Sequence, residues 1–422
     1  MNEWVVHKFG GSCLRTPSDI ERIHQRIVSI PGRPIIVVSA LWGVTDRLLR
    51  SVNEPLQWSR LVNDLRKQHA RFAPTVEFGE TSQQFKQVIE ILSENMLRLC
   101  QDPLDQDARH EVLACGERLA CIVVSEALRL KGLEIMPVQS DELGIMISKS
   151  SSSIDLESTL ERIDKQLIEG PIPVISGWFG LGESGKTRVL NRGGSDLSAA
   201  ALATILEAES VILWKDVPGV LSVSPRWGID SATISYLGYG EALALARAGG
   251  VVLHAGCIEP LRGTGIPLQI RPLNDDGPYT VIGPEINIDE SRVSAISCTP
   301  GIVHYDIEAK ANEITILLND LMRLIEDEAV KVWALSAVEG NISLLVPSTR
   351  SLEVDSILEG AEVAVEKSDV ASLVSLIGSG LKHEMPGAIA TVEEKHAIHH
   401  LLDEDDLNRV ISELANHHHL MA

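Results

Sequence analysis

Several segments of this sequence place a charged residue beside glycines, a combination that could bind and transfer a phosphate. In HKFGGSCL (residues 7–14), Lys8 ends an apolar run and is followed by Gly10, Gly11 and Ser12. Glycine allows backbone N–H groups to approach a ligand closely, and a lysine there can place a positive charge on a phosphate in transfer. A tight turn that carries a surface lysine explains this segment equally well when it is taken alone.

A second segment, LNRGGSDLSAAALA (190–203), combines an arginine with two glycines and an acid. The guanidinium of Arg192 has the planar fork that suits a carboxylate, and Gly193 and Gly194 expose backbone donors. Asp196 falls in the first turn of the helix that follows, where it could orient a lysine or contact Mg²⁺. A glycine turn followed by a helix cap is the alternative explanation.

Three further segments add charges and hydroxyl groups. LWKDVPGVLSVSPRW (213–227) ends an apolar run with Lys215 and Asp216, ahead of a Pro-Gly turn and Arg226, although a plain hairpin also explains it. The other two are VVSALWGVTDRL, with Ser39 and Thr45, and LACGERLACIVV, with Glu117 in a helical pattern. A single glutamate on a helix is more often a solvated charge than a ligand.

The segment GLGESGKT (180–187) satisfies G-x-x-x-x-G-K-[ST], the pattern of a phosphate-binding P-loop. A P-loop runs directly into a helix, whose first N–H groups and positive dipole end face the phosphates. Here two adjacent glycines follow within two turns and would break such a helix. The context predicts instead a β-hairpin, with strands over 173–179 and 187–190, and a helix that begins only at Ser195.

Residues 1–285 alternate short apolar runs with helical stretches, which predicts a largely parallel sheet covered by helices on both faces. Ligands of such folds bind beyond the C-terminal ends of the strands, where most of the glycine-rich segments fall. The expected strands are Glu3–Lys8, Pro34–Ser39, Glu134–Val138, Pro173–Trp178, Ser210–Lys215 and Pro267–Arg271. The expected helices are Pro17–Ser29, Pro55–Phe72, Gln83–Leu99, His110–Leu130, Ser195–Leu206 and Gly240–Arg247.

The pattern changes near Asp275-Asp276-Gly277-Pro278. Residues 290–370 read strand–helix–strand–strand–helix–strand, the ferredoxin-like arrangement of small α+β modules. Residues 371–422 look like a second, shortened copy that lacks a helix and a strand between Gly387 and His396. We therefore expect one large α/β domain over 1–285, followed by two small modules.

The bulk properties exclude several classes of protein. The chain has 422 residues and a net charge of −22, which argues against nucleic acid and anionic membranes as partners. No apolar run approaches the ~20 residues of a membrane span, and the chain enters a strand at once, which leaves no room for a signal peptide. Six cysteines without C-x-x-C spacing suggest neither a zinc site nor disulfides, so we expect a cytoplasmic protein.

Taken together and in order, these segments resemble the motifs of aspartate kinases, within the amino-acid kinase superfamily. That family's K-F-G-G-[TS]-S resembles Lys8–Cys13, its G-E motif resembles Gly116-Glu117, and its hairpin followed by R-G-G-S-D resembles 177–196. W-T-D-V-x-G-V resembles Trp214–Val220, and G-A-K-V-L-H resembles Gly249–His254. Five motifs in order, over almost the whole chain, are far more specific than any one of them.

The resemblance implies transfer of the γ-phosphoryl group of ATP to the side-chain carboxylate of L-aspartate, with ATP and Mg²⁺ as cofactors. The residues it assigns to the nucleotide are Lys8, Gly10, Gly11, Ser12, Lys215, Asp216, Pro218 and Arg226, with Asp196 organising Lys8 and the metal side. The residues it assigns to the acceptor are Ser39, Thr45, Glu117, Trp178, Arg192 and Ser195. No residues are assigned as a dedicated set of metal ligands.

Within the acceptor set, the resemblance gives Arg192 the α-carboxylate of the substrate and Glu117 its ammonium group. The C-terminal modules resemble ACT domains, which implies an amino-acid effector and a homodimer or higher homo-oligomer.

The sequence departs from the family pattern at several positions. The family's lysine in G-A-K-V-L-H is Val251 here, which removes one of two cations expected near the phosphates. The threonine of W-T-D-V is Lys215, which could supply the missing charge from the neighbouring strand end. Leu221 and Ser224 replace a tyrosine and an aspartate on the adenine side, and Trp178 replaces the pocket phenylalanine.

Two alternatives to an aspartate kinase stay open: an enzyme that phosphorylates another small carboxylic or amino acid, and an inactive protein that binds effectors through its ACT-like modules. An aspartate kinase is favoured because Lys8, Glu117, Arg192 and Asp196 are all retained.

The remaining polar feature is a set of histidines around the last helix. They show no metal-ligand spacing, and we expect them to lie in a solvated tail. The set comprises His396, His399, His400, His417, His418 and His419.

Overall fold

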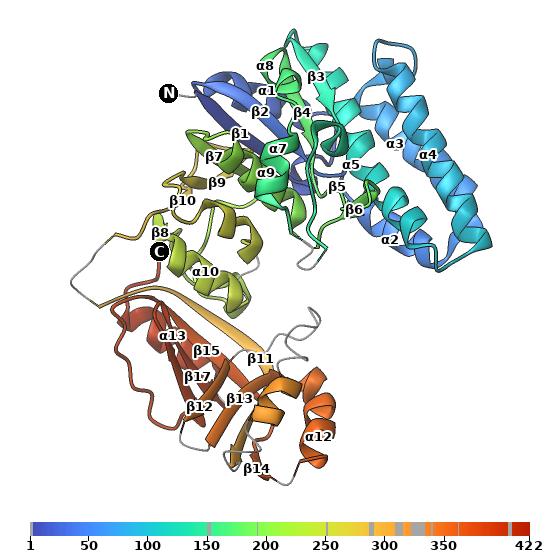
Figure 1. Ribbon diagram of the computed structural model, residues 1–422. Helices are drawn as coiled ribbons and strands as arrows, with labels where there is room; N and C mark the ends of the chain where they lie inside the picture. The colour runs from blue at the N-terminus through green and yellow to red at the C-terminus, as the bar shows by residue number, and fades with distance from the viewer. Residues whose placement is uncertain are drawn as a thin grey trace. The chain divides into compact units, whose positions relative to one another are not determined.

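A computed structural model describes residues 3–149, 153–191, 193–249, 252–286, 291–308, 315–321, 334–338, 341–361, 363–403 and 407–422. The chain forms two compact units (Figure 1). The first comprises Met1–Val220, Ser235–Tyr239 and Val252–Glu285, and the second comprises Leu221–Ile234, Gly240–Val251 and Ile286–Ala422.

The first unit is built on an eight-stranded sheet with the order β3-β4-β2-β1-β7-β9-β10-β8. Neighbouring strands from β3 to β9 are parallel, and only β9 and β10 pair antiparallel. The central strands are buried, which explains their continuous runs of Val, Ile and Leu. The strands are β1 (Trp4–Phe9), β2 (Arg33–Val38), β3 (Ile135–Val138), β4 (Ile172–Ser176), β7 (Ser210–Lys215), β8 (Tyr236–Gly238), β9 (Leu268–Pro272) and β10 (Thr280–Gly283).

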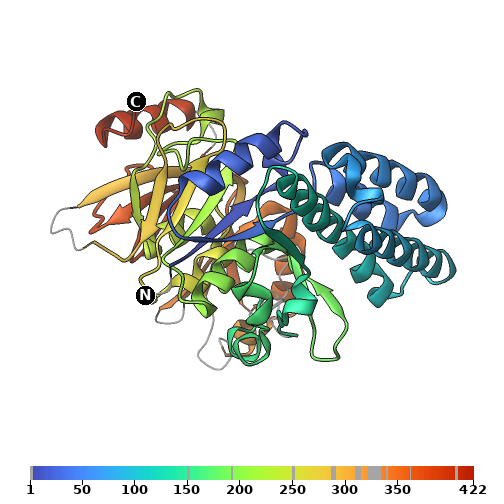
Figure 2. The same ribbon diagram turned by 90° about the horizontal axis from the view of Figure 1, so that it is seen from above.

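Helices cover both faces of this sheet (Figures 1 and 2). The helices α1 (Asp19–Ser29) and α5 (Gln106–Arg129) cover one face, where Val5 and Phe9 of β1 join the main hydrophobic core. The other face carries α7 (Leu156–Arg162) and α9 (Gly194–Ile205), and α9 packs against β1 and β7. Because side chains alternate along a strand, Lys8 lies on the face that α9 covers.

A group of helices extends from the sheet beside α5 (Figures 1 and 2). It contains α2 (Val44–Asn53), α3 (Trp58–Phe72) and α4 (Ser82–Gln101), which pack on one another and on α5. Apolar residues such as Leu48, Leu65 and Leu92 are fully buried between them. Two short helices, α6 (Ser140–Leu143) and α8 (Gln166–Glu169), complete this unit.

The segment GLGESGKT forms a hairpin as predicted, but the first arm is not the strand predicted over 173–179, because β4 ends at Ser176 in the large sheet and a separate strand begins at Phe179. The strands β5 (Phe179–Leu181) and β6 (Thr187–Val189) pair antiparallel, and α9 begins only at Gly194. The hairpin is anchored to α5, because Lys186 and Arg188 both pair with Asp107. The P-loop pattern is therefore a coincidence of sequence.

The second unit is built on a seven-stranded antiparallel sheet with the order β12-β13-β11-β15-β17-β16, in which β14 also pairs with β11. The long strand β11 serves two modules: its first part pairs with β15, and its second part pairs with β13 and β14. The pairing changes at Gly301, whose φ of 76° favours glycine. The strands are β11 (Arg292–Glu308), β12 (Ala334–Val338), β13 (Asn341–Pro347), β14 (Ala364–Lys367), β15 (Ala371–Ser379), β16 (Ala390–Glu394) and β17 (Ala397–Leu402).

Helices cover both modules of this sheet. Residues 315–321 and α12 (Ser351–Glu359) bury Leu317, Leu321 and Val354 against the first module, whose strand order β12-β13-β11-β14 is ferredoxin-like. Helix α13 (Leu407–His417) covers the second module through Ile411 and Leu414. Most of α10 (Tyr239–Arg247) belongs to this unit, where Ala248 accepts a hydrogen bond from Ser297.

Two expectations for the second module are wrong. The strand predicted to be missing between Gly387 and His396 is present as β16, an edge strand whose mostly exposed residues gave no apolar signal. The connection from β15 to β16, residues 380–389, contains no helix. Of the helix and strand predicted to be missing, only the helix is therefore absent from this module. His399 and His400 do not lie in a solvated tail but in β17, where both are buried.

Candidate active site

Two lysines and an aspartate meet at the C-terminal edge of the large sheet. Lys8 Nζ lies 2.5 Å from Asp196 Oδ1, and Lys215 Nζ donates to Asp196 Oδ2 at 2.8 Å. The strands β1 and β7 are parallel neighbours that end at this edge, with Phe9 beside Trp214 in the register. Asp196 comes from the first turn of α9, so the positive end of the helix dipole lies beside the two ammonium groups.

The strand alternation explains why both lysines point at α9. Ile212 and Trp214 of β7 belong to the core on the opposite face, so Lys215 projects toward α9, as Lys8 does from β1. Lys8 is 5% exposed and Asp196 is 6% exposed. Burying a charge without a partner raises the free energy of the folded state. Here the single carboxylate of Asp196 faces the ammonium groups of both Lys8 and Lys215. The cluster therefore keeps an excess positive charge.

Burial and pairing shift the pKa values of these groups in different directions. Burial outweighs the attraction of Asp196 and lowers the pKa of Lys8, with Lys215 adding repulsion. Burial also acts on Lys215, but Asp196 outweighs it and raises the pKa of that lysine. Burial would raise the pKa of Asp196, but the two lysines hold it well below its usual range. Asp196 is thus ionised throughout the physiological range.

The two glycines of the turn after β1 have little space around them. A Cβ on Gly11 would lie 3.1 Å from the carbonyl oxygen of Ala40, and one on Gly10 would lie 3.2 Å from Lys8 Nζ. The chain then forms a short 3-10 turn, Gly11–Cys13, which includes Ser12. The backbone therefore passes directly beside the ammonium group of Lys8.

A cavity of about 280 Å³ adjoins the cluster. Its lining combines Lys8 and Asp196 of the cluster with hydroxyls, carboxylates and a tryptophan from other segments. The lining residues are Lys8, Ser39, Thr45, Asp46, Leu49, Glu117, Trp178, Gly193, Gly194, Ser195 and Asp196.

Glu117 brings a buried carboxyl group to this cavity from α5. Its Oε1 accepts a hydrogen bond from the backbone N–H of Ala40 at 3.2 Å, and its buried Oε2 has no partner among the described residues. Burial raises the pKa of Glu117 to about 8, against the smaller opposing effects of the Ala40 N–H and Lys8. An unpaired buried oxygen of this kind is a site for a donor supplied by a ligand.

Trp178 shapes the same cavity from a strained backbone. Its φ is 71°, which is unusual for a residue other than glycine, and its Nε1 donates to the carbonyl of Asn191 at 3.1 Å. A Cβ on Gly194 would lie 2.6 Å from Cδ1 of Trp178, and one on Gly193 would lie 2.6 Å from Cγ of His254. Both glycines are therefore needed for α9 to begin where it does.

The family model of the amino acid kinase family matches residues 3–272, which include every part of this cluster and cavity. The chain belongs to the amino acid kinase family.

Within this family, its curated relatives include an aspartokinase of Bacillus sp. (strain MGA3), 26% identical in an alignment of 410 residues that covers 93% of this chain and 88% of that protein. The chloroplastic aspartokinase 2 of Arabidopsis thaliana is 26% identical over 90% of this chain and 75% of its own length.

Among solved structures, E. coli aspartokinase III in complex with aspartate and ADP has a TM-score of 0.80 at 20% identity, covering 98% of this chain and 99% of that one. The same enzyme in complex with lysine and aspartate has a TM-score of 0.74 at 22% identity, with the same coverage. These structures show the fold, and they confirm the predicted amino-acid-kinase architecture with C-terminal ferredoxin-like modules.

The structure gathers most of the predicted residues of this amino acid kinase in the first unit. Lys8, Asp196 and Lys215 form the cluster, and five residues predicted for the acceptor line the cavity: Ser39, Thr45, Glu117, Trp178 and Ser195. Asp216 follows Lys215 and pairs with Arg15 at 2.7 Å, while Pro218 lies in the turn beyond it.

The structure does not test the assignments of Arg226 and Arg192. Arg226 belongs to the second unit, where its guanidinium donates to the carbonyl of Cys298. Arg192 and Val251 lie outside the described residues. The assignments of Arg192 to the substrate and of Arg226 to the nucleotide therefore stay predictions.

The sequence interpretation missed Asp46 and Leu49, which line the cavity from α2. Leu49 lies one turn after Thr45 on the same face of α2, so the helical spacing would have found it, whereas Asp46 gave no such signal. Among the described residues, no group of three His, Cys, Asp or Glu side chains could hold a metal ion. The described helices include none that is long and apolar enough to cross a membrane.

Proposed function

We propose that this protein transfers the γ-phosphoryl group of ATP to the side-chain carboxylate of L-aspartate, which yields 4-phospho-L-aspartate and ADP. The observation that carries the proposal is the Lys8–Asp196–Lys215 cluster, which opens into a cavity containing the unpaired carboxylate oxygen of Glu117. The similarity to aspartokinases over nine-tenths of the chain supports the choice of substrate.

In the proposed reaction, a carboxylate oxygen of aspartate attacks the γ-phosphorus of ATP, and the bond to the oxygen between the β- and γ-phosphates breaks. The carboxylate is already ionised at neutral pH, so no general base is needed. Catalysis then rests on holding the reactants in line and on stabilising charge on the phosphoryl oxygens. The two ammonium groups and the backbone N–H groups of Gly10, Gly11 and Ser12 would provide that stabilisation.

Lys215 takes the place of the lysine that the family has at the position of Val251. Its side chain reaches the carboxylate of Asp196 on the side opposite to Lys8, so the two cations flank one anion. A triphosphate placed at this edge would meet both ammonium groups. Asp216, Pro218 and Arg226 are proposed to contact the rest of the nucleotide.

Glu117 is proposed to bind the ammonium group of aspartate, and Arg192 its α-carboxylate. An ammonium group beside Glu117 would offset the burial that raises the pKa of this residue. Ser39, Thr45, Ser195 and Trp178 would fix the remainder of the acceptor. The cavity of about 280 Å³ suits a ligand of the size of a small amino acid.

Mg²⁺ is proposed to enter with ATP, held by phosphate oxygens and by water. This ion is commonly bound through one or two carboxylates and the phosphates of the substrate, so it needs no full set of protein ligands. Asp196 is the acid placed to meet it. The ion would neutralise charge on the β- and γ-phosphates.

The ferredoxin-like modules of the second unit would act as ACT domains and bind an amino-acid effector. The protein would form a homodimer or a higher homo-oligomer. It would work in the cytoplasm.

The test is a coupled assay of ADP release with L-aspartate and with a panel of other small carboxylic and amino acids. We expect turnover with L-aspartate that is lost in Lys8→Ala. Turnover only with another acid would replace L-aspartate as the proposed substrate. Absence of turnover with every acid, in a folded protein that binds ATP, would overturn the kinase proposal.

A further inference from the structure

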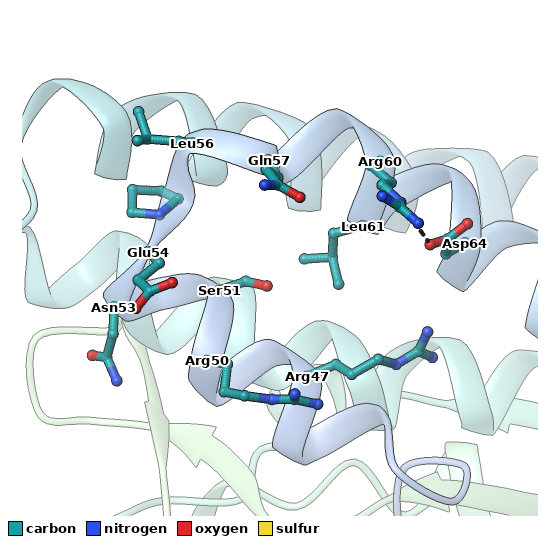
Figure 3. A pocket seen from close by; sticks show the side chains of 11 residues that line it. Arg47, Arg50, Ser51, Asn53, Glu54, Leu56, Gln57, Arg60, Leu61 and Asp64 are labelled. Carbon is teal, nitrogen blue, oxygen red and sulfur yellow. Dashed lines mark ion pairs between the residues drawn. The ribbon is translucent and has the colours of Figure 1, made fainter.

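A groove of about 760 Å³ lies between α2 and α3 of the first unit, apart from the acceptor cavity (Figure 3). No residue lines both the groove and the cavity. Its lining is rich in arginine, with hydroxyl and amide groups between. The lining residues are Arg47, Arg50, Ser51, Asn53, Glu54, Pro55, Leu56, Gln57, Arg60, Leu61 and Asp64.

The charges of this groove are unlike those of the chain as a whole. Three arginines and two carboxylates line it, whereas the chain carries a net charge of −22. Arg47 and Arg50 lie three residues apart on α2, and Arg60 lies across from them in the first turn of α3 (Figure 3). Residues at this helical spacing share a face, so both arginines of α2 serve the same groove.

Most of the guanidinium donors in the groove are available to a ligand. Arg50 uses only its Nε, which donates to the carbonyl of Asp46 at 3.2 Å, and its two Nη groups have no partner in the described part of the chain. Arg60 Nε approaches Asp64 at 3.9 Å, beyond hydrogen-bond range. Arg47 donates to Gln68 through Nη2 alone.

The beginning of α3 adds to the positive character of this place. The helix has no side-chain cap and no acidic residue in its first turn, and Gln57 and Arg60 at that end both line the groove. The N-terminus of a helix of this length carries a partial positive charge. Glu54 and Asp64 oppose it, but they are fewer than the arginines.

We propose that this groove is a binding site for a small oxyanion, a metabolite that carries phosphate or several carboxylates, with Arg50 and Arg60 as its main donors. A guanidinium binds either group through two parallel hydrogen bonds. The volume lies in the range of small-molecule sites, about 300–1,000 Å³.

Helix α2 connects the groove with the acceptor cavity. Thr45, Asp46 and Leu49 of this helix line the cavity, while Arg47, Arg50 and Ser51 line the groove. An anion that draws the arginines of α2 toward α3 therefore acts on the helix that holds Thr45. The site is then an effector site whose occupation changes the KM for the acceptor, a consequence that rests on the proposed function.

The binding test uses inorganic pyrophosphate as the probe, in isothermal titration calorimetry of the full chain at constant ionic strength. We expect saturable binding that weakens about tenfold or more in Arg50→Gln and in Arg60→Gln, because each loses charge-assisted hydrogen bonds. Arg71→Gln, an exposed arginine of the same helix α3 outside the groove, is the matched control and should bind as the unaltered protein does.

The cluster at Lys8 could also bind pyrophosphate, so the same titration is made with Lys8→Ala. The groove site should persist in Lys8→Ala and disappear in the double variant of Arg50 and Arg60. Binding that is lost in Lys8→Ala but kept in the double variant would overturn the proposal, as would the absence of saturable binding. Circular dichroism of each variant checks that it is folded.

The effector role is tested by initial rates at constant free Mg²⁺. Pyrophosphate should change the KM for L-aspartate of the unaltered protein and of Arg71→Gln, and this change should be absent in the Arg50 and Arg60 variants. Binding at the groove without this difference would overturn the effector role. The calorimetric result does not depend on turnover, so failure of the proposed function and failure of the anion site are separable.

Discussion

Two groups of ionisable side chains, one in each unit, differ in their charge state. In the first unit, Lys8 and Asp196 are buried and Lys215 is partly buried, and their charges pair with one another beside an open cavity. The second unit buries neutral imidazoles: His399 bonds to the hydroxyl of Ser375 at 2.7 Å, and His400 bonds to that of Thr391 at 3.0 Å.

The two groups differ in how much their burial lowers the stability of the fold. Charges taken from water are costly, and a buried cluster with excess positive charge is hard to explain by stability alone. A neutral histidine bonded to a hydroxyl costs little and contributes to packing. We therefore expect changes in the first cluster to affect turnover and changes among the buried histidines to affect stability.

The largest effect is expected from Asp196→Asn. Without the carboxylate the two lysines lose the anion that orients both of them, and their mutual repulsion is no longer offset. Loss of one preorganised electrostatic group lowers kcat about 10²–10³-fold. Steady-state ADP release measures this, and a kcat within about threefold of the unaltered protein would remove the cluster from the mechanism.

Lys215→Thr restores the residue that the family has at this position and tests the second cation. We expect kcat/KM for ATP to fall about 10- to 100-fold, since Val251 supplies no charge in its place. Lys215→Arg is the control and should retain part of the activity, because it keeps the charge. An unchanged rate in Lys215→Thr would show that Lys8 acts alone.

The pH dependence of the KM for aspartate tests Glu117. Its raised pKa, about 8, means that the free protein holds a neutral carboxyl at neutral pH, whereas an ammonium group requires the ionised form. The KM should therefore fall as the pH rises from about 6 to about 8, by at most about tenfold per pH unit. In Glu117→Gln the KM should be high and should lack this dependence; the same slope in both proteins would exclude Glu117 as the ammonium site.

The smallest effect is expected in the second unit. Burial, with repulsion from His383 and His399, lowers the pKa of His400 to about 4, below the 6.5 of an unfolded chain. The unfolded state then binds a proton that the native state does not, so stability is lost as the pH falls from about 6.5 toward 4. A fall of a few degrees in Tm is expected. The fall should be smaller in His400→Asn, whose kcat at pH 8 should match that of the unaltered protein. A large loss of kcat in His400→Asn would contradict the expectation that the buried histidines affect stability and not turnover.

The sequence predicts the cluster well because its signals are local. Lys8 and Lys215 each end an apolar run, and Asp196 follows two glycines at a helix start, so strand order alone brings them together. The arginine groove gives no such signal, since Arg47 and Arg60 meet only through the packing of α2 on α3. His399 and His400 are wrongly predicted to lie in a solvated tail. Their strand β17 pairs with β16, and β16 is polar and mostly exposed, so the sequence shows no sign of this pairing.

The central claim is that Lys8, Lys215 and the amides of Gly10 and Gly11 surround the phosphates of one nucleotide. A crystal structure with L-aspartate and a non-hydrolysable ATP analogue tests it most directly. We predict the γ-phosphate within hydrogen-bond distance of both ammonium groups, with the aspartate ammonium at Glu117. Phosphates bound elsewhere, for example at the 182–186 turn of the hairpin, would contradict the account.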